Sequence, residues 1–202
     1  ISKRRRKDWN PRPDPGTLSW HSYIEHINMS EGEWLILARN NYLLNQAEQQ
    51  CRLEGFFYSR ANRKGISESL LNAILDWEKL RKGEAVSAGQ VKQIYKYMTA
   101  DKGVAKQHRS LKSVFEEKIL SMKELLASHG LLTTAIWHEA FDRVTDKEKQ
   151  YLIACLRRGE KLTTTPRIQI STIHASKGGE ADNVIVLTDI GQKSWLEMQK
   201  QP

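Results

Sequence analysis

The sequence has few of the residues that would assign it to several common protein classes. Only two cysteines and five prolines occur among 202 residues, so a disulfide framework or a proline-rich architecture is excluded. Cys51 and Cys155 have no partner spacing, and isolated cysteines of this kind are typical of small buried side chains in a reducing compartment. No apolar run approaches the roughly 20 residues that a membrane-spanning helix needs. We therefore expect a cytoplasmic protein with no membrane partner.

Patterns of catalytic and ligating residues are missing as well. The six histidines show no ligand spacing with cysteine or acidic residues, so no metal site is expected. No acidic cluster follows a predicted strand, which argues against a nuclease. The sequence has no Gly-x-x-x-x-Gly-Lys-Ser/Thr loop, whose backbone amides would hold the β- and γ-phosphates of a nucleotide. By itself the chain is expected not to hydrolyse ATP.

Positive charge is present, and it is unevenly distributed. The formal net charge is +8, and residues 1–14 hold six Lys and Arg against two acids. Residues 60–112 hold twelve Lys and Arg against five acids, whereas residues 113–202 hold twelve of each. A local basic excess is expected where a protein meets phosphate-rich partners. A merely solubilising face is the alternative that charge alone leaves open.

The chain begins with an arm and a first strand pattern. Residues 1–16 combine a basic run with three prolines, which predicts an extended arm and not a packed element. Residues 18–24 are interpreted as an edge strand. Residues 33–38 form a short apolar run before a polar turn, as is typical of a buried parallel strand.

A helix and a second strand follow. Asn40 and Asn41 predict a helix cap, and apolar residues recur at helical spacing from Leu43 to Cys51. Gly55 is predicted to end this helix, and residues 56–58 begin the next strand. Strand–helix–strand at this length predicts a parallel sheet.

Helical periodicity replaces the strand pattern over residues 61–159. Three apolar stripes are predicted: Ile66, Leu70, Leu71, Ile74, Trp77 and Leu80; Leu111, Val114, Phe115, Ile119, Met122 and Leu126; and Tyr151, Leu152, Cys155 and Leu156. The strand pattern then returns at residue 167. The prediction is an α/β protein whose sheet, built from residues 17–60 and 160–202, is interrupted by an all-α inserted subdomain.

Residues 168–189 are the most informative stretch. Two apolar strand patterns, Ile168–Ile170 and Val184–Leu187, bracket a polar loop. The loop concentrates hydroxyls, an imidazole, an ammonium, a carboxylate and a glycine pair. In open α/β sheets, ligands bind at loops beyond the carboxyl ends of strands, so this loop is the candidate binding site.

This stretch resembles the Thr-x-His-x-x-Lys-Gly-x-Glu motif of UvrD/Rep-type superfamily 1 DNA helicases, and its Gly-Gly-Glu-Ala-Asp-Asn-Val form is most similar to phage-type members. Residues 34–41, with the helix and the Gly55–Tyr58 segment that follow, resemble the strand–Arg–Asn–helix opening of the family's second motor domain. The resemblance implies a RecA-like domain that is part of an ATP-dependent, 3′-to-5′ DNA helicase of a bacterium or phage-infected cell. ATP and Mg²⁺ would bind in a cleft completed by a first motor domain.

The resemblance also implies roles for single residues. Nucleotide contacts are implied for Lys177, Gly178, Gly179, Glu180 and Arg39. Contacts to single-stranded DNA are implied for Thr172, His174 and Ser176, and the basic excess adds Arg60, Arg63 and Lys64.

Structural roles remain open for several of these residues. Thr172 could close a turn, His174 could be a satisfied structural histidine, and Arg39 could form an internal ion pair. Among the basic residues of the helical segment, Tyr95 and Tyr97 could stack on bases, although core packing explains most aromatic residues. For the whole chain, the alternative is a non-catalytic DNA- or protein-binding module derived from a helicase domain.

Overall fold

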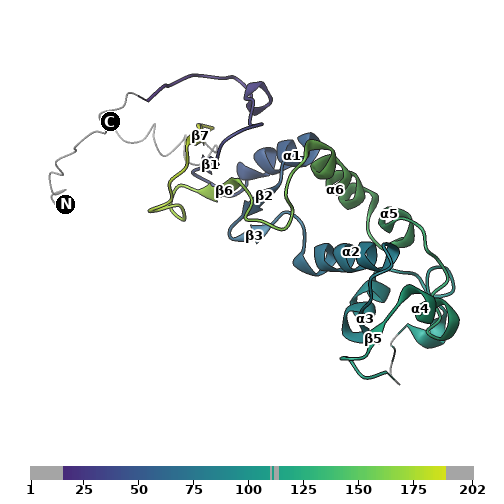
Figure 1. The fold of residues 1–202 in the computed structure, drawn as a ribbon. Coiled ribbons are helices and arrows are strands. Elements are labelled where there is room, and N and C mark those ends of the chain that lie inside the picture. Colours follow the sequence, from purple (N-terminus) through teal and green to yellow (C-terminus); the bar gives the residue numbers. More distant parts are fainter. Residues whose placement is uncertain (1–15, 110, 112–113, 190–202) are drawn as a thin grey trace.

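The structure is a computed structural model and describes residues 16–109, 111 and 114–189. The predicted basic arm, except for Gly16, therefore lies outside the described residues, as do residues 190–202. The described chain is a mixed α/β protein with a mostly parallel central sheet and six α-helices (Figure 1). Its sheet has the order β3-β2-β6-β1-β7. These strands are β1 (Trp34–Ala38), β2 (Tyr58–Arg60), β3 (Arg63–Lys64), β6 (Ile168–Thr172) and β7 (Asn183–Leu187).

The sheet joins two parts of the chain that are about 130 residues apart in sequence. β6 lies between β1 and β2 and is parallel to both, and β7 is parallel to β1 on its other side. Among the described strands of this sheet, only β2 and β3 pair in the antiparallel direction. The predicted parallel sheet is confirmed, and the strand patterns at residues 33–38, 168–170 and 184–187 are confirmed with it.

One face of the sheet is apolar because strand residues alternate in direction. Ile36, Ala38, Ile168 and Ile170 are each at most 1% exposed. They face helix α1 (Leu44–Glu54), which contacts both β1 and β6. The helix ends at Gly55, whose φ of +71° is the left-handed conformation that favours glycine. The predicted helix and its stop are confirmed.

Two expectations for this part of the chain are wrong. Residues 18–24 form no strand, and only the short 3₁₀ helix η1 (Ile24–His26) occurs there. The residue that caps α1 is Leu43, with no side-chain hydrogen bond. Asn40 and Asn41 lie in the turn before it, where the Asn41 side chain instead accepts a hydrogen bond from Arg60.

The segment between β3 and β6 is largely helical. Its first stripe is confirmed, because the predicted apolar residues on α2 (Glu68–Arg81) are buried, as is Ile66 just before the helix. Ser67 caps α2, and its side chain accepts from Leu70 N. The other elements are β4 (Val86–Ser87), α3 (Ala88–Lys96), η2 (Lys106–His108), β5 (Ile119–Leu120), α4 (Met122–Ser128), α5 (Trp137–Ala140) and α6 (Asp146–Arg158). β4 and β5 form a small antiparallel ribbon.

The second predicted stripe is wrong. A capping box between Ser121 and Glu124 starts α4 only at Met122, and the described stripe residues before it, Leu111, Val114, Phe115 and Ile119, lie outside any helix. Phe115, expected on the buried stripe, is 85% exposed, and Ile119 is 60% exposed. Ile119 belongs to β5 instead. Local capping chemistry therefore overrode an apparent helical periodicity.

The third predicted stripe lies on α6, and α6 packs against α1. The Tyr151 hydroxyl donates to the carbonyl of Phe56 at 2.8 Å. Cys155 is fully buried, whereas Leu156 is 51% exposed. The sequence pattern placed this helix in the predicted all-α segment, but the contacts of α6 with α1 place it in the helical layer that covers the sheet.

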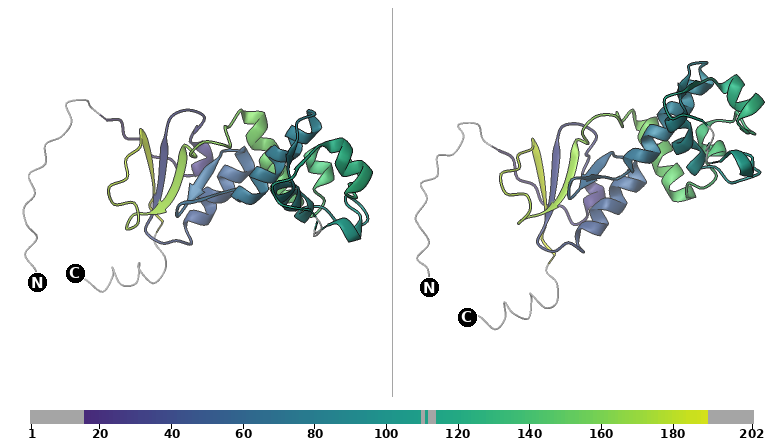
Figure 2. Two further views of the ribbon diagram at one scale, coloured as in Figure 1. Left: turned by 60° about the horizontal axis from the view of Figure 1, so that its bottom comes forward. Right: turned by 90° about the horizontal axis from the view of Figure 1, so that it is seen from below.

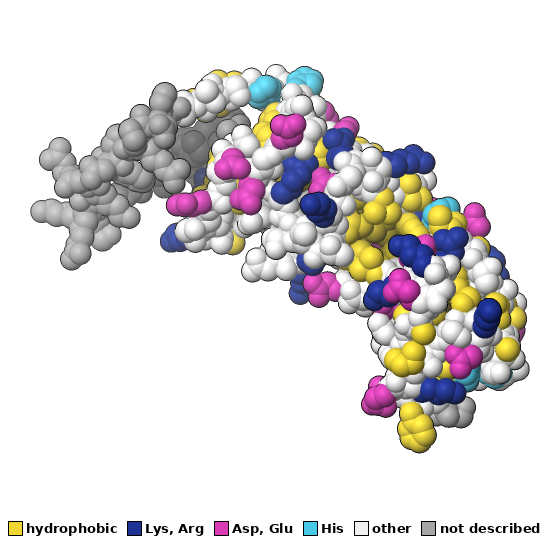
Figure 3. Space-filling model, in the orientation of Figure 1, with side chains coloured by type: hydrophobic (Ala, Val, Ile, Leu, Met, Phe, Trp, Pro, Cys, Tyr) yellow, Lys and Arg dark blue, Asp and Glu magenta, His cyan; other side chains and the backbone are white. Residues whose placement is uncertain are grey.

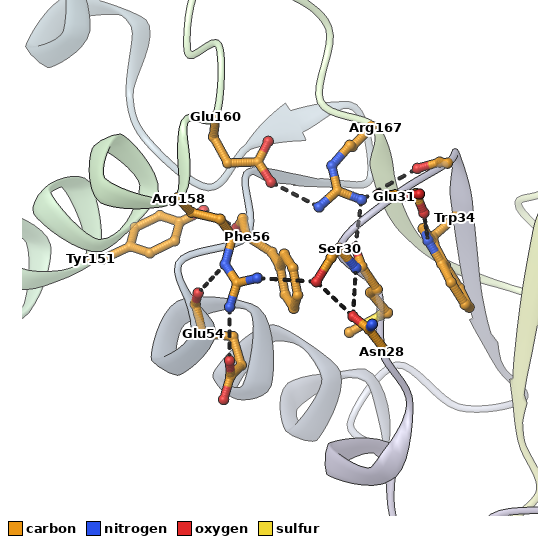
Figure 4. A network of polar contacts seen from close by, with 12 residues as sticks. Asn28, Ser30, Glu31, Trp34, Glu54, Phe56, Tyr151, Arg158, Glu160 and Arg167 are labelled. Atoms are coloured by element: carbon orange, nitrogen blue, oxygen red, sulfur yellow. Dashed lines mark hydrogen bonds and ion pairs between the residues drawn. The ribbon is translucent and has the colours of Figure 1, made fainter.

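Two arginines fasten the end of α6 to the amino edge of the sheet (Figure 4). Arg158 donates to the carbonyl and the carboxylate of Glu54 at 2.7 and 2.9 Å. Arg167, just before β6, donates to Glu160 at 2.9 Å and to the carbonyl of Met29 at 2.6 Å. Both guanidinium groups lie over the Phe56 ring. Their charges are compensated within the fold, so this edge is a structural junction.

The molecule is elongated, with the sheet at one end and α3 and α4 at the other (Figure 2). Hydrophobic side chains gather where α2 meets α6 (Figure 3), around an apolar groove of about 200 Å³ lined by Leu75, Trp137 and Leu156. Within the described ranges, no helix combines the length and apolar character required to cross a membrane.

Candidate functional site

The carboxyl ends of β1 and β6 lie side by side. Ala38 pairs with Thr172 in the parallel register, and Ile173 N donates to the carbonyl of Ala38 at 3.0 Å. Arg39 follows directly and is exposed. Parallel pairing thus brings Arg39 and the start of the β6–β7 loop, residues 173–182, to one edge of the sheet. The sequence separates them by more than 130 residues.

The first half of the β6–β7 loop is held by its own hydrogen bonds. The Thr172 carbonyl accepts from Ala175 N and Ser176 N, both at 3.1 Å, and the Thr172 hydroxyl accepts from Ala175 N at 3.3 Å. The Ser176 hydroxyl donates to the carbonyl of Ile173 at 3.2 Å. Both hydroxyls therefore close turns, which is the structural role left open for Thr172. A hydroxyl oxygen engaged in this way still has a second lone pair for a ligand.

The charged and imidazole side chains of the loop do not point into the core. His174, Lys177 and Glu180 are exposed. His174 is therefore not a buried structural histidine. An exposed imidazole and ammonium on a fixed turn are suited to contact phosphate oxygens, and such contacts position a strand without reading its bases.

Glycines shape the turn in the middle of the loop. Gly178 has a φ of +81°, and Gly179 N donates to the carbonyl of Ser176 at 2.8 Å. A Cβ added at Gly179 would lie 3.1 Å from that carbonyl oxygen and 3.8 Å from Leu35 of β1. The loop thus passes closely over β1 on the sheet face opposite α1.

The loop then returns to the amino edge of the sheet. Asp182 accepts from Glu33 N at 3.2 Å, and Asn183 N donates to the Glu33 carbonyl at 3.0 Å. β7 begins there. Because both ends of the loop are tied to β1, its position over the sheet is defined by the fold.

A pocket of about 250 Å³ opens between this loop and the turn that joins β2 to β3. Lys177, Gly178 and Gly179 line one side, and Ala61 and Asn62 line the other. Three of the five residues for which nucleotide contacts were expected therefore border one pocket. Neither Arg39 nor Glu180 lines it.

The structure also indicates pocket residues that the sequence did not suggest. Ser59, Gln169 and Ser171 line its floor. Gln169 and Ser171 alternate with buried isoleucines in β6, and this period-two pattern was the available signal. Ser59 and Asn62 come from a distant segment, so no local pattern links them to the loop.

Arg60 has a different role from the DNA contact that was expected. Its guanidinium donates to Glu48 at 2.7 Å, to Asn45 at 2.8 Å, and to the carbonyl and side chain of Asn41 at 2.8 and 3.0 Å. The Tyr58 hydroxyl also donates to Glu48, at 2.7 Å. Arg60 is thus an internal clamp between β2 and the start of α1, and it is removed from the candidate DNA surface.

Burial and hydrogen bonding oppose each other at Glu48. Burial raises the pKa of its carboxyl, but the hydrogen bonds from Tyr58 and Arg60, with the charges of Arg52 and Arg60, bring the pKa below its ordinary value. Burial also raises the pKa of Tyr58. The carboxylate form of Glu48 is therefore the form that this network stabilises.

Arg63 and Lys64 lie on the short strand β3 beside the pocket turn. Arg63 is exposed, and Lys64 pairs with Glu68 at 3.3 Å. The Lys64 side chain is 26% exposed and that of Glu68 is 73% exposed. The DNA contacts expected for Arg63 and Lys64 remain predictions.

The two tyrosines of the helical segment pack within the protein. Tyr95 is fully buried and donates to the His129 carbonyl at 3.0 Å. Tyr97 is half-buried and stacks on Phe141 with ring centroids 5.7 Å apart. Core packing is therefore the role of both rings.

Across residues 16–109, 111 and 114–189, no group of three or more His, Cys, Asp or Glu side chains is arranged to hold a metal ion. None of the comparisons, with protein-family models, with curated proteins and with solved structures, found a match for this chain.

Proposed function

We propose that this chain is part of an ATP-dependent DNA helicase that translocates on single-stranded DNA. In this proposal the sheet and its covering helices, α6 among them, form the RecA-like second motor domain. The largely helical segment between β3 and α6 is its insert; the expectation of an all-α segment over residues 61–159 is corrected by the β4–β5 ribbon and by β3, which belongs to the main sheet. The domain supplies one half of the ATP cleft, and a first motor domain supplies the other half together with the phosphate-binding loop.

One observation carries the proposal. The loop whose sequence resembles the helicase motif lies exposed at the carboxyl edge of a parallel sheet, beside Arg39, with His174 and Lys177 accessible. Carboxyl edges are where open α/β sheets bind ligands. Buried loop side chains inside a closed core would have removed the basis for the proposal.

The loop also suits the mechanical task of a motor. Thr172 joins it to β6, and Asp182 joins it to the start of β1. A displacement of one end by nucleotide would be transmitted to groups that hold the strand, because both ends belong to one short, hydrogen-bonded segment. ATP and Mg²⁺ would act in the complete cleft, with Lys177, Gly178, Gly179, Glu180 and Arg39 on the nucleotide side.

The first test measures binding of the 202-residue chain to a single-stranded oligothymidylate at several salt concentrations. We expect weak binding whose logarithm falls linearly with the logarithm of salt, by about 0.7 for each phosphate neutralised. Arg63→Ala should weaken binding and reduce this slope, whereas Lys147→Ala, an equal charge change at an exposed position of α6, should leave it unchanged. Affinity that does not vary with salt would reject the strand-binding role.

The second test uses the complete polypeptide. His174→Ala is expected to abolish most of the stimulation of ATP hydrolysis by single-stranded DNA while leaving the unstimulated rate near that of the parent. His21→Ala, which removes an exposed histidine outside the loop, is the matched control. Normal DNA-stimulated turnover in His174→Ala would contradict the assignment.

A further inference from the structure

Pairing across the sheet builds a polar floor under the β6–β7 loop. Ser59 of β2 and Leu35 of β1 are both register partners of Gln169 in β6. All three line the pocket. Neighbouring strands are about 4.8 Å apart, so these side chains form one continuous row of hydroxyl, amide and isobutyl groups. Ser171 is two residues further along β6 on the same face.

The polar groups of this row are available to a ligand. Within the part of the chain that the structure describes, the side chains of Ser59, Gln169 and Asn62 have no hydrogen-bond partner. The Ser171 hydroxyl makes only a 3.3 Å contact with the adjacent Thr172 carbonyl. Parallel strands usually carry apolar residues on both faces. A cluster of unpaired amides and hydroxyls in a pocket on such a sheet is therefore unusual.

Both rims of the pocket are preformed. Ala61 and Asn62 have φ values of +48° and +63° in the two-residue turn between β2 and β3, as a tight hairpin requires. Arg60, just before this turn, is fixed by its bonds to Glu48 and Asn45. The opposite rim is the Ser176–Gly179 turn. A site built in this way loses little conformational entropy when a ligand binds.

The size and charge of the pocket limit what it can hold. Its volume of about 250 Å³ is below the ~300–1,000 Å³ of pockets that enclose drug-sized ligands. Of the described residues that line it, only Lys177 is charged. One ammonium at the rim matches one anionic group, the amides and hydroxyls can bond the hydroxyl or ring oxygens of a pentose, and Leu35 offers an apolar contact.

We infer that this pocket binds a pentose phosphate, the sugar–phosphate unit of one nucleotide, with Gln169 and Ser59 bonding the sugar and Lys177 the phosphate. The inference rests on the proposed function and deepens it, because the unit can come from a free nucleotide or from a DNA strand. It assigns a binding role to three side chains, Ser59, Asn62 and Gln169, that lie outside the motif.

The test follows the Gln169 side-chain amide and the Gly178 and Gly179 backbone amides of the 202-residue chain by NMR, during separate titrations with ATP and with a 15-nucleotide oligothymidylate. We expect one of the two probes to shift all three resonances. Gln169→Leu keeps the approximate side-chain size but removes the amide, so it should weaken the binding of that probe about 5- to 10-fold. Gln46→Leu, on the exposed side of α1, is the matched control and should have no effect.

The possible outcomes distinguish the inferred sugar–phosphate pocket from the proposed helicase function. Shifts with ATP identify a free nucleotide as the source of the sugar phosphate, and shifts with the oligothymidylate identify a strand. Strand binding that depends on Arg63 and salt, while neither probe shifts the Gln169 amide and Gln169→Leu leaves the affinity unchanged, would overturn the pocket and retain the motor. Gln169-dependent ATP binding, with no strand binding at any salt concentration, would retain the pocket and reject the motor. Binding of neither probe would overturn the inference.

Discussion

The two faces of the central sheet are built from alternate residues of the same strands, yet they have opposite characters. The face toward α1 is closed, with Ile36, Ile168 and Ile170 at most 1% exposed. The opposite face carries Gln169 and Ser171, and at β7 it leaves Val184 54% exposed. Among the described residues no helix covers this second face, and the β6–β7 loop crosses it.

Because successive strand residues point to opposite faces, alternate residues of one strand contribute either to the stability of the fold or to ligand binding. The closed face removes apolar surface from water, at roughly 25 cal/mol for each Å². The open face supplies unpaired polar groups, an ammonium and glycine backbone next to them. A change on one face should therefore affect the unfolding equilibrium, and a change on the other should affect ligands. Three experiments on folding can break or sharpen this contrast.

The largest difference in the free energy of unfolding is expected between substitutions at two adjacent residues of β6. Ile168→Ala should lower the free energy of unfolding by about 2–5 kcal/mol, because it leaves a cavity under α1. Gln169→Ala should change it by no more than about 0.5 kcal/mol, because its side chain is exposed. Urea titrations of both variants measure the two values. Losses of equal size would show that the open face is buried in solution.

A smaller contrast is expected between two glycines in the left-handed conformation. Alanine in that conformation costs about 1–2 kcal/mol, which is the loss expected for Gly178→Ala, since a Cβ there meets nothing within 4 Å. At Gly55 the same Cβ would lie 2.6 Å from the Ala154 backbone, so overpacking adds about 1–3 kcal/mol. Thermal and urea unfolding should rank Gly55→Ala as the less stable variant. The reverse order would mean that α1 and α6 pack less closely.

The smallest effect concerns the charged network beside the closed face. The folded pKa of Glu48 lies below its ordinary value of 4.5. The stabilisation from its carboxylate is therefore complete above that value and is lost as pH falls through the lower folded pKa. Glu48→Gln lacks this component. The stability advantage of the parent over Glu48→Gln, up to about 1 kcal/mol, should be present at pH 6 and shrink toward pH 3. An advantage that stays constant with pH would show that the carboxylate charge contributes nothing.

Local patterns predicted those elements whose local and tertiary preferences agree. The strand at residues 33–38, the helix that stops at Gly55 and the stripe of α2 were predictable because apolar period and end signals coincide. The prediction of a helical stripe from Leu111 to Leu126 was wrong because Ser121 and Glu124 form a capping box, so a helix begins only within that segment. The prediction of an edge strand at residues 18–24 was wrong because an extended segment becomes a strand only beside a partner strand, and none of the described strands pairs with it.

The candidate site was predictable only in part, for a similar reason. The β6–β7 loop is continuous in sequence, so its hydroxyl, imidazole, ammonium and glycine residues could be recognised together. The role of Arg60 could not be recognised, because Arg60 lies on β2 whereas Glu48 and Asn45 lie on α1, and their hydrogen bonds to Arg60 depend on packing. A basic residue near a candidate site is a DNA contact or an ion pair according to which partner the fold places beside it.

The sequence by itself determined the strand and helix preferences of the core, the excess of positive charge and the chemistry of one polar loop. These are properties of neighbouring residues, and periodicity and composition report them directly. Only the tertiary structure decided that β6 lies between β1 and β2, that Ser59 and Gln169 share a row, and that one sheet face stays open beneath the loop. Those features depend on contacts between residues more than 100 positions apart, where free energy is set by packing and pairing in three dimensions.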